Sequence, residues 1–573
     1  MKKSPYWPDG VPTKINGFKK PLYDLLDQSA NLYPDKTYTI FQGATKTFKQ
    51  VRDYADRVAN FLKKNGLKKG DRVAIFLPNL PQYPVIFFGV LKAGGICVNC
   101  NPLYTPGELN HQLKDSGATW VFCMDHPQFY KTALEATEGT DVGKNNIVIC
   151  NIKNWLPKVK SILGSLLGKI PKAESHRPEH KFLDDILNNT PPIEKNQEVD
   201  PDDPAVLIYT GGTTGLPKGA VLTHTNLVFD VMALEQYIRI SHEEGAPPEP
   251  PRKGGFHCYL GVLPWYHSFG LTVCMLAACS SGSRLICIPD PRAGNPPFTE
   301  VLKQVEKFKP TFVVGVPTLF SAFINHPLID KFDLTSIICC ASGGAPLPVE
   351  LAKEFERKTG CIIYEGYGLT ETSPVICANP SDKKKRRFGT VGFPVPNTEI
   401  KIVDLDTGTI ELPQGEDGEI AVSGPQVMKG YWKNPQADAQ VFREIEGKRF
   451  FLTGDIGHFD KDGFLVITDR KKDLIIVGGF NCYPREVEEV LYAHPKVAQA
   501  AVIGVPHPKS GEVVKAFIQL KEGESATEEE ILEFCKERLA GYKRPRYIEF
   551  RKELPTSAVG KVLRRVLREE ERT

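Results

Sequence analysis

The first regular pattern of apolar residues in the chain has the spacing of a helix. Between Thr47 and Gly66 the apolar positions recur every three or four residues, at Phe48, Val51, Tyr54, Val58 and Phe61. This spacing places them on one face of a helix. Thr47 and Gln50 have the sequence of a capping box, and glycine commonly follows the last turn of a helix. The pattern therefore predicts an amphipathic helix between these two limits.

Short apolar runs then alternate with helical segments through most of the chain. Strands are predicted at 72–77, 96–99 and 119–123, with a helix at 82–93 and a second capping box from Thr105 to Glu108. The rhythm resumes with strands at 205–209, 284–288, 311–316, 336–341 and 361–364. Such alternation is typical of parallel sheets covered by helices on both faces. Two doubly wound α/β subdomains are therefore expected.

Two later changes of pattern predict the domain boundaries. After about residue 388 short strands replace helical periodicity, as at 399–403 and 418–422, which indicates a small β-rich subdomain. A charged run at 469–473 precedes predicted helices at 484–493 and 527–539. The fold class is predicted as α/β: a large N-terminal region, 1–470, and a small mobile α+β C-terminal domain, 471–573. The N-terminal region divides into α/β subdomains at about 1–200 and 201–387 and the β-rich subdomain at 388–470.

Two polar stretches interrupt this organisation. Residues 151–201 are basic and punctuated by proline, which indicates an insertion, and 241–255 predict a mobile surface loop. An apolar face ringed by lysines in the insertion indicates contact with a membrane surface through 153–170, and a helix packed on the protein body is the alternative. The apolar positions are Trp155, Val159, Ile162, Leu163, Leu166 and Ile170, and the lysines are Lys153, Lys158, Lys160 and Lys169.

Composition narrows the classes of partner. The chain has 72 Lys and Arg against 69 Asp and Glu, a net charge of +3, so no overall field favours nucleic acid and a small-molecule substrate is expected. The first residues lack the apolar core of a signal peptide and the apolar run 85–91 is too short to span a bilayer, so a cytoplasmic location is expected. The scattered cysteines predict reduced, buried thiols, and the isolated pair Cys97 and Cys100 predicts a strand end rather than a metal site.

A loop rich in glycine and threonine, residues 209–219 with the sequence YTGGTTGLPKG, follows the apolar run 205–208. Glycines allow close backbone approach, while threonine hydroxyls and Lys218 can contact phosphate, so a polyphosphate-binding loop is predicted over a plain surface turn. Pro217 stands where a Walker A motif has the glycine before its lysine, and glycine rather than serine or threonine follows Lys218. A P-loop kinase or ATPase is therefore disfavoured.

Five further motifs follow in order: LPWYHSFG at 263–270, SGGAP at 342–346, GYGLTET at 366–372, TGD at 453–455 and PTSAVGK at 555–561. Together with the 209–219 loop they resemble the motifs of the AMP-forming adenylating enzymes, the acyl-CoA synthetase and luciferase superfamily. Three of these motifs have a plainer alternative when taken alone: a helix cap for Thr370 or Glu371, core packing for His267 and a solvated face for Lys561. The motifs run from Tyr209 to Lys561, and the domain pattern fits almost the whole chain.

The resemblance implies a nucleotide-binding role for most of these residues. Tyr367 should pack on adenine, Thr370 should contact the α-phosphate, and Asp455 and Arg470 should contact the ribose. The full implied set is Thr210, Gly211, Gly212, Thr213, Thr214, Gly215, Lys218, Gly343, Gly344, Ala345, Glu365, Gly366, Tyr367, Gly368, Leu369, Thr370, Asp455 and Arg470.

The resemblance also implies the catalytic and moving parts. The implied Mg²⁺ ligands are Glu371 and Thr214, and the implied catalytic residues are Lys561, Thr214, Glu371 and His267. His267 should line the acyl pocket. Lys472 matches the hinge of the C-terminal domain, and Gly478 and Gly479 should lie near the pantetheine channel.

These motifs are most like those of long-chain fatty acid CoA ligases. The implied reaction activates a fatty acid with ATP to an acyl-adenylate, which CoA then opens to acyl-CoA, releasing pyrophosphate and AMP. Leu271 stands where some long-chain members have a tryptophan that gates the acyl tunnel. The alternatives are an adenylating enzyme that loads a carrier protein and a catalytically silent acyl-binding protein. The expected location is cytoplasmic, with peripheral contact on the inner membrane surface.

Overall fold

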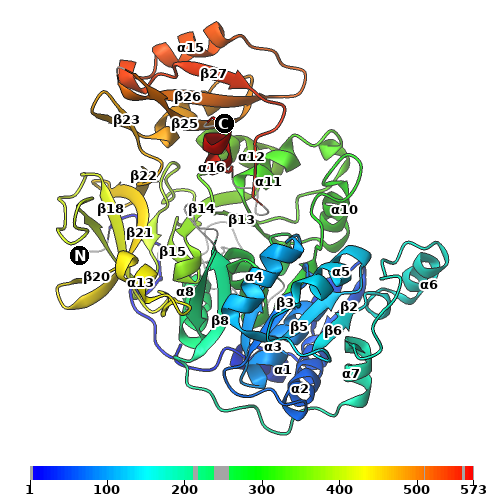
Figure 1. Ribbon diagram of the computed structural model, residues 1–573. Coiled ribbons are helices and arrows are strands. Elements are labelled where there is room, and N and C mark those ends of the chain that lie inside the picture. The colour runs from blue at the N-terminus through cyan, green and yellow to red at the C-terminus, as the bar shows by residue number, and fades with distance from the viewer. Residues whose placement is uncertain (1–3, 211–216, 238–256, 509, 558–561, 572–573) are drawn as a thin grey trace.

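Four β-sheets form the framework of the computed structural model over the residues it describes, which are 4–210, 217–237, 257–508, 510–557 and 562–571. Figure 1 shows two large sheets with their helices in the lower body, a β-rich sheet at the left and the C-terminal domain at the top. This arrangement confirms the predicted α/β class. The predicted loop 241–255 lies outside the described residues.

A nine-stranded sheet carries the strands on which several predicted nucleotide residues lie. Its six central strands, from β14 to β1, are parallel, while β2, β15 and β16 pair antiparallel at the edges. In spatial order the strands are β16 (Phe393–Pro394), β15 (Val375–Ala378), β14 (Ile362–Gly368), β13 (Cys339–Ser342), β12 (Phe312–Gly315), β10 (Cys258–Gly261), β11 (Arg284–Cys287), β1 (Thr37–Phe41) and β2 (Ala44–Thr47).

An eight-stranded sheet carries both ends of the predicted phosphate loop. The strands from β8 to β7 are parallel, and β9 and β19 pair antiparallel at one edge. In spatial order they are β19 (Gly430–Tyr431), β9 (Lys218–Thr223), β8 (Pro204–Thr210), β4 (Ile96–Asn99), β3 (Arg72–Phe76), β5 (Ala118–Met124), β6 (Ile147–Cys150) and β7 (Lys181–Phe182). Residues 211–216 join β8 to β9 and lie outside the described ranges.

Helices cover these two sheets. Both predicted capping boxes are present, since the Thr47 and Thr105 hydroxyls accept from the backbone amides of Gln50 and Glu108, whose side chains accept in return. Every residue of α3 is buried, as expected for a helix whose residues between Gln82 and Lys92 are almost all apolar. The helices are α1 (Asp24–Leu32), α2 (Phe48–Lys64), α3 (Gln82–Lys92), α4 (Pro106–Ser116), α5 (Pro127–Ala136), α6 (Lys158–Leu166), α7 (Leu183–Asn189), α8 (His224–Tyr237), α9 (Ala277–Ser280), α10 (Thr299–Phe308), α11 (Pro317–Ile324) and α12 (Val349–Thr359).

Two five-stranded sheets complete the chain. The first consists of β17 (Glu399–Val403), β18 (Gly418–Ser423), β20 (Phe442–Ile445), β21 (Lys448–Phe459) and β22 (Leu465–Arg470), with α13 (Pro435–Val441) beside it. The C-terminal sheet consists of β23 (Ile475–Val477), β24 (Phe480–Cys482), β25 (Val497–His507), β26 (Gly511–Leu520) and β27 (Tyr547–Phe550), with α14 (Pro484–Tyr492), α15 (Glu528–Lys536) and α16 (Arg564–Glu570). The buried apolar residues of the C-terminal domain form clusters separate from the main core.

The two large sheets do not divide at residue 200, where the sequence pattern placed the boundary between the α/β subdomains. β1 and β2, near the N-terminus, belong to the nine-stranded sheet, whereas β8, β9 and β19 complete the eight-stranded sheet. Local periodicity gives the type of each strand, but pairing between distant segments decides which sheet it joins. The insertion 151–201 contains α6, β7 and α7.

The cysteines have the predicted character. All fourteen lie in the described ranges, are buried and form no disulfide. Cys97 lies in β4 and Cys100 directly follows it, so the CxxC pair marks a strand end. Among the described helices, none combines the length and apolar character needed to cross a bilayer.

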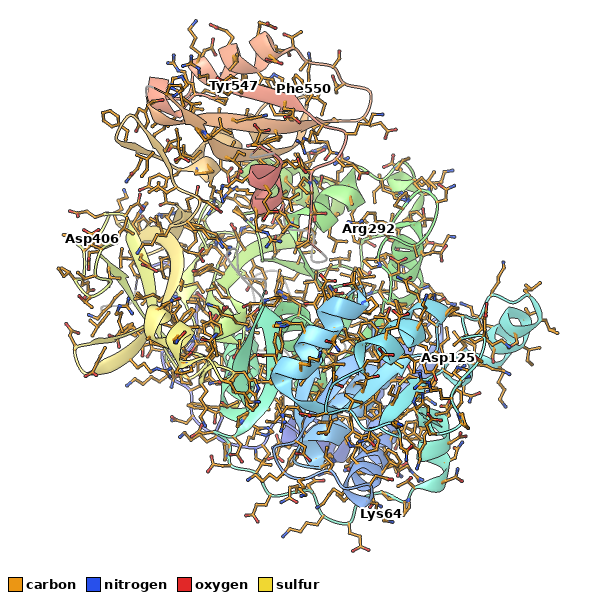
Figure 2. All side chains as sticks on the ribbon, viewed as in Figure 1. Lys64, Asp125, Arg292, Asp406, Tyr547 and Phe550 are labelled. Atoms are coloured by element: carbon orange, nitrogen blue, oxygen red, sulfur yellow. The ribbon has the colours of Figure 1, made fainter. Side chains whose placement is uncertain are left out.

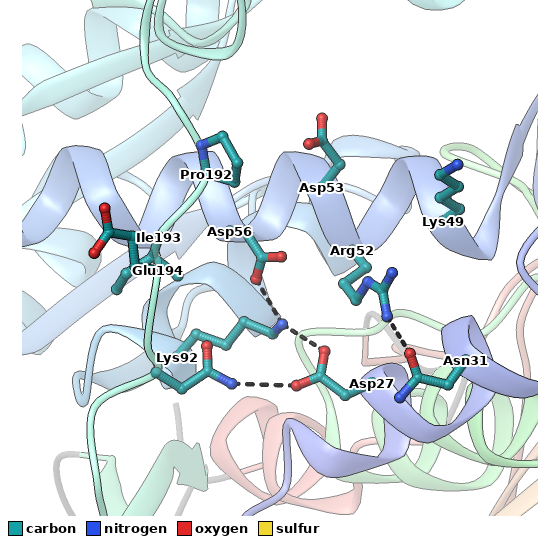
Figure 3. A pocket seen from close by; sticks show the side chains of 11 residues that line it. Asp27, Asn31, Lys49, Arg52, Asp53, Asp56, Lys92, Pro192, Ile193 and Glu194 are labelled. Carbon is teal, nitrogen blue, oxygen red and sulfur yellow. Dashed lines mark hydrogen bonds and ion pairs between the residues drawn. The ribbon is translucent and has the colours of Figure 1, made fainter.

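One buried charge joins the three helices α1, α2 and α3. The Lys92 ammonium, at the end of α3, lies 2.5 Å from Asp27 Oδ1 and 2.6 Å from Asp56 Oδ1 (Figure 3). Asn196 Nδ2 donates to the other oxygen of Asp27 at 3.2 Å. Burial raises the pKa of Asp56, and Lys92 opposes that shift by stabilising the carboxylate. These groups line a polar recess of about 500 Å³.

Replacing Lys92 with Met should destabilise this packing, because two carboxylates would then face each other without a cation. Removing one partner of a buried pair costs about 3–5 kcal/mol, and the partial exposure of the aspartates reduces the expected loss to about 2 kcal/mol. A fall of about 2 °C in melting temperature is expected for a chain of this size. Lys49→Met, at an exposed lysine lining the same recess, is the matched control. Equal melting temperatures for Lys92→Met and wild type would contradict the assignment.

Candidate active site

Three of the predicted motifs meet at the carboxyl ends of β13 and β14. The strands are parallel neighbours, and their register pairs Ser342 with Glu365, so the loops that follow them lie side by side. The 263–270 segment joins them, because Ser268 Oγ and Thr370 Oγ1 are 3.3 Å apart. Ligands of open α/β sheets bind outside the carboxyl ends of the strands, and this edge is therefore the candidate site.

Two positions in these loops require glycine, one because of a close backbone contact and one because of its φ angle. A Cβ on Gly368 would lie 1.7 Å from the carbonyl oxygen of Pro374, so no other residue fits there. Gly344 has a φ of 76°, in the left-handed region that favours glycine. The ring of Phe269 packs close to Gly343, where an added Cβ would lie 3.0 Å from the ring. This contact places the 263–270 segment against the SGGAP loop.

A hydrogen-bonded group around the buried Asp455 carboxylate forms the predicted ribose side of the site. The Tyr367 hydroxyl donates to Asp455 Oδ2 at 2.7 Å, and the Arg470 guanidinium lies 3.1 Å from Asp455 Oδ1. β21 and β22 pair Asp455 directly with Arg470. Burial and the neighbouring carboxylate raise the pKa of Tyr367, while Asp455 raises the pKa of Arg470. The phenol therefore stays protonated and the guanidinium charged at neutral pH.

A second set of contacts links the phosphate-loop hairpin to the predicted metal ligand. Thr210 and Lys218 are paired across β8 and β9, so they hold the two ends of the loop together. The Lys218 ammonium lies 5.3 Å from the ring centroid of Tyr431, and the Tyr431 hydroxyl donates to Glu371 Oε1 at 2.9 Å. Burial raises the pKa of Glu371, and the Tyr431 hydrogen bond lowers it. Gly211, Gly212, Thr213, Thr214, Gly215 and Lys561 lie outside the described residues.

Glu365, at the same edge of the nine-stranded sheet, accepts a hydrogen bond that supports a neighbouring loop. Its Oε1 accepts from the backbone N–H of Leu347 at 3.0 Å, and burial raises its pKa to about 7. The carboxyl therefore supports the loop that contains Ala345. Gly366 pairs with Ala378 in β15, and the Leu369 amide donates to the Pro374 carbonyl, so these backbone positions are fixed by the edge of the sheet.

His267 lies at the start of an unusual helical segment. The residue is half-buried, and its Nδ1 accepts from the backbone N–H of Phe269 at 3.3 Å. A π-helix follows over Gly270–Leu276, and every residue in it, including Leu271, is buried. π-helical turns are rare and often occur at functional sites. The sequence shows no periodicity that could have predicted this turn.

Polar contacts cross the predicted hinge. The Asp469 carboxylate accepts from the backbone N–H of Arg485 at 2.7 Å and lies 3.3 Å from the Arg564 guanidinium. Arg564 also contacts Asp473 and Glu488. Lys472 is exposed between these groups.

The predicted CoA-channel residues form the turn of the β23–β24 hairpin. Gly478 and Gly479 are exposed and have φ values of 59° and 87°. Phe480, which follows them, is exposed at the end of the turn and its ring stacks on Tyr542. The structure therefore brings residues 267–270, 343–345 and 365–371 together with Asp455 and Arg470, and leaves this turn exposed.

Tyr431 is the residue that sequence reasoning missed. It lies in the two-residue strand β19, which pairs with β9, and it joins Lys218 to Glu371. No local pattern could have found it, because a strand of two residues shows no periodicity and its partners lie far away in the chain.

Comparisons with known proteins agree with this architecture. The sequence profile of the AMP-binding enzyme matches residues 26–432, and that of the AMP-binding enzyme C-terminal domain matches 486–561. A long-chain-fatty-acid–CoA ligase of Bacillus subtilis is 42% identical over 99% of this chain and 97% of its own length. A protein of the same name from Escherichia coli is 40% identical, with the same coverage.

Solved structures agree over the whole chain. The anthranilate CoA ligase AuaEII in complex with anthranoyl-AMP has a TM-score of 0.83 and 27% identity, covering 97% of this chain and 98% of its own. ATP-bound MatB from Rhodopseudomonas palustris has a TM-score of 0.79 and 30% identity, with 96% and 98% coverage. Since the profile spans more than half of the chain and the relatives nearly all of it, the chain belongs to the AMP-binding enzyme family.

Proposed function

We propose that this protein is a long-chain fatty acid CoA ligase that forms an acyl-adenylate from ATP and then transfers the acyl group to CoA. The observation that carries this conclusion is the 42% and 40% identity, over 99% of the chain, to proteins named long-chain-fatty-acid–CoA ligase. The meeting of the predicted motifs at the ends of β13 and β14 supports it. The site residues carry the roles that the resemblance implies.

The first half-reaction joins two anions. A fatty acid carboxylate oxygen attacks the α-phosphorus of ATP, the bond from this phosphorus to the bridging oxygen breaks, and pyrophosphate leaves. Lys218, the 211–215 amides and hydroxyls, and Lys561 offset the repulsion and stabilise charge on the transferring group. His267 lines the acyl side, where its neighbour Ser268 contacts Thr370.

The nucleoside is held at the ribose side of the site, by Tyr367, Asp455 and Arg470. Tyr367 packs against adenine beside the backbone of Gly343, Gly344 and Ala345. Asp455 accepts hydrogen bonds from the ribose hydroxyls, and Arg470, 3.1 Å away, orients this carboxylate. Rigid contacts of this kind place the α-phosphorus for in-line attack.

Mg²⁺ fits the donors at the phosphate end. Among the described residues no cluster of three or more His, Cys, Asp or Glu side chains could form a cage for an ion. Glu371 is a single half-buried carboxylate, and Mg²⁺ is commonly held by one or two carboxylates together with substrate phosphates. Glu371, with Thr214, would hold the ion, which would neutralise charge on the triphosphate.

The second half-reaction requires the C-terminal domain to turn about Lys472. The CoA thiol loses its proton and attacks the acyl carbonyl, the bond to the AMP oxygen breaks, and AMP leaves. The Gly478–Gly479 turn then lines the pantetheine channel. The contacts across the hinge are ionic and hydrogen-bonded, so they can exchange with water as the domain moves.

The protein works in the cytoplasm in peripheral contact with the inner membrane surface. Fourteen buried cysteines without a disulfide suit a reducing compartment. Long-chain fatty acids partition into bilayers, so contact with a lipid surface would give the enzyme access to its substrate.

Tyr431→Phe should move the acidic limb of activity to higher pH. The variant loses the hydroxyl that stabilises the Glu371 carboxylate, so the pKa of Glu371 rises further and this ligand protonates earlier as the pH falls. The pH dependence of kcat/KM for ATP, measured at fixed Mg²⁺, tests this expectation. Tyr547→Phe, at an exposed tyrosine in the C-terminal sheet (Figure 2), is the control. Superimposable profiles for Tyr431→Phe and wild type would refute the role of this contact.

Acceptance of fatty acids should rise with chain length. Each buried methylene contributes about 0.8 kcal/mol, roughly a fourfold gain in kcat/KM while the added carbon still enters the acyl tunnel. Pyrophosphate release measured from acetate to palmitate tests this expectation. Equal kcat/KM for acetate and palmitate would exclude the long-chain assignment and leave the adenylation chemistry intact.

Two lysine variants should impair opposite half-reactions. Lys561→Ala removes a cation from the adenylation transition state, which typically costs about 100- to 1,000-fold, whereas thioester formation from supplied acyl-adenylate should persist. Lys472→Pro fixes φ near −65° at the hinge and should slow thioester formation while sparing adenylation.

Single-turnover measurement of each half-reaction separates these outcomes. Lys552→Ala, at an exposed lysine of the C-terminal domain, controls for loss of charge, and Lys472→Ala controls for loss of the side chain without the backbone restriction. If Lys561→Ala slows both halves equally and Lys472→Pro slows neither, the alternation of the C-terminal domain is wrong.

A further inference from the structure

Helix α6 presents an apolar stripe to solvent. Its apolar residues are spaced by three and four, so they share one face, and none of the nine residues of the helix is buried. The side chains of this α6 face are 52% to 77% exposed, and its members are Val159, Ile162, Leu163, Leu166 and the adjacent Leu167. The other large apolar residues that are exposed on the described surface are scattered through the chain. The alternative of a helix packed on the protein body is therefore wrong.

The segment that carries α6 is fixed at both ends by one carboxylate. Asp125, which follows β5 and is labelled in Figure 2, accepts from the Asn151 side chain at 2.7 Å and from the Ala173 backbone N–H at 2.8 Å. Residues 151–173 therefore leave and rejoin the body at the same point. In Figure 1 α6 projects beyond the sheets at the edge of the molecule.

Trp155 and Ile170, expected on the apolar face, have other roles. The Trp155 indole is buried, packs edge-on against Tyr54 and donates from Nε1 to Asp184 at 3.0 Å. It therefore anchors the base of the segment. Ile170 packs back against Gly164, where a Cβ would lie 3.0 Å from it. Trp155 and Ile170 thus fix the base of the segment, and the α6 face stays exposed to solvent.

The charge of residues 151–173 indicates the kind of surface that α6 can bind. Residues 151–173 contain five lysines and no aspartate or glutamate. Helical periodicity places Lys158 and Lys160 on either side of the apolar stripe. Lys153, Lys158, Lys169 and Lys172 are exposed, and among the described residues none of these four forms an ion pair. An apolar stripe flanked by lysines matches an interfacial helix at an anionic lipid surface.

We propose that the α6 face is a docking site for an anionic bilayer, in which its aliphatic side chains enter the acyl boundary and its lysines meet the lipid headgroups. The inference rests on the proposed function, because a long-chain fatty acid is a substrate held in membranes. The partner is a lipid surface rather than a protein, since the stripe is purely aliphatic and lacks the aromatic, methionine and arginine side chains that are enriched at protein interfaces.

Sedimentation with vesicles tests the apolar part. Wild type should bind vesicles that contain phosphatidylglycerol, and Leu163→Asp/Leu166→Asp should lose at least about tenfold in partitioning, because two carboxylates enter the stripe. Leu32→Asp/Leu103→Asp, at two similarly exposed leucines outside the segment, should bind as wild type does. Melting temperatures show that each variant is folded. Equal sedimentation of the α6 variant and wild type would overturn the proposal, as would absence of vesicle binding with self-association through α6.

The lysines are tested separately. Lys158→Gln/Lys169→Gln/Lys172→Gln should reduce binding to anionic vesicles by roughly fivefold for each charge that reaches the surface, and should leave binding to phosphatidylcholine vesicles unchanged. Equal loss on both kinds of vesicle would contradict the electrostatic part.

Activity assays separate this proposal from the proposed function. With palmitate in detergent, the Leu163→Asp/Leu166→Asp variant should form palmitoyl-CoA as fast as wild type, whereas with palmitate supplied in vesicles it should be slower. If wild type forms no palmitoyl-CoA in detergent, the ligase assignment fails while sedimentation still decides the lipid contact. If the variant is equally fast with both forms of palmitate, α6 does not deliver substrate.

Discussion

Parallel pairing of β13 with β14 is the constraint on which the candidate site depends. The register that sets Ser342 beside Glu365 fixes where both strands end, so the SGGAP and GYGLTET loops emerge together. The other parts reach that edge from elsewhere: Ser268 contacts Thr370, Asp455 contacts Tyr367, and Tyr431 contacts Glu371. Three distant segments thus attach through hydrogen bonds to the end of β14 and the loop that follows it, while the sheet supplies the rigidity.

Sequence reasoning predicted the parts of this fold that local physics determines. The capping boxes at Thr47 and Thr105, the strand at 96–99 and the helix from 82 all have the expected type, because periodicity and capping act within a few residues. The assignment of strands to sheets was not accessible, since the pairing of β1 with β11 joins positions far apart in the chain. Tyr431 was not predicted for the same reason, because its partners are distant in the chain. Trp155 was expected on the exposed apolar face, but its contacts with the Asp184 carboxylate and the Tyr54 ring keep it buried. The motifs predicted the site by resemblance, and the structure adds the contacts that orient their side chains.

Burial of charge is used differently in the two regions of the chain. In the body, Lys92 joins two carboxylates of neighbouring helices, and Arg470 is paired with the buried Asp455. At the predicted hinge, Arg564 gathers Asp469, Asp473 and Glu488 around a joint between separate apolar cores. An ionic joint of this kind resists separation less than an apolar one when water can enter. The chain therefore combines a rigid site with a C-terminal domain that is attached through contacts that can exchange with water.

The interleaving of the two large sheets has a consequence for synthesis on the ribosome. β1 and β2 emerge early, but their neighbour β11 follows more than two hundred residues later, and β19 completes the other sheet later still. At about 5–20 residues per second, the first strands wait on the order of ten seconds or more for that neighbour. During this interval the open strand edges and the largely apolar α3 are available for wrong pairing. Neither half of the body can mature alone, so nascent chains of this protein are expected to depend on chaperones until the body is nearly complete.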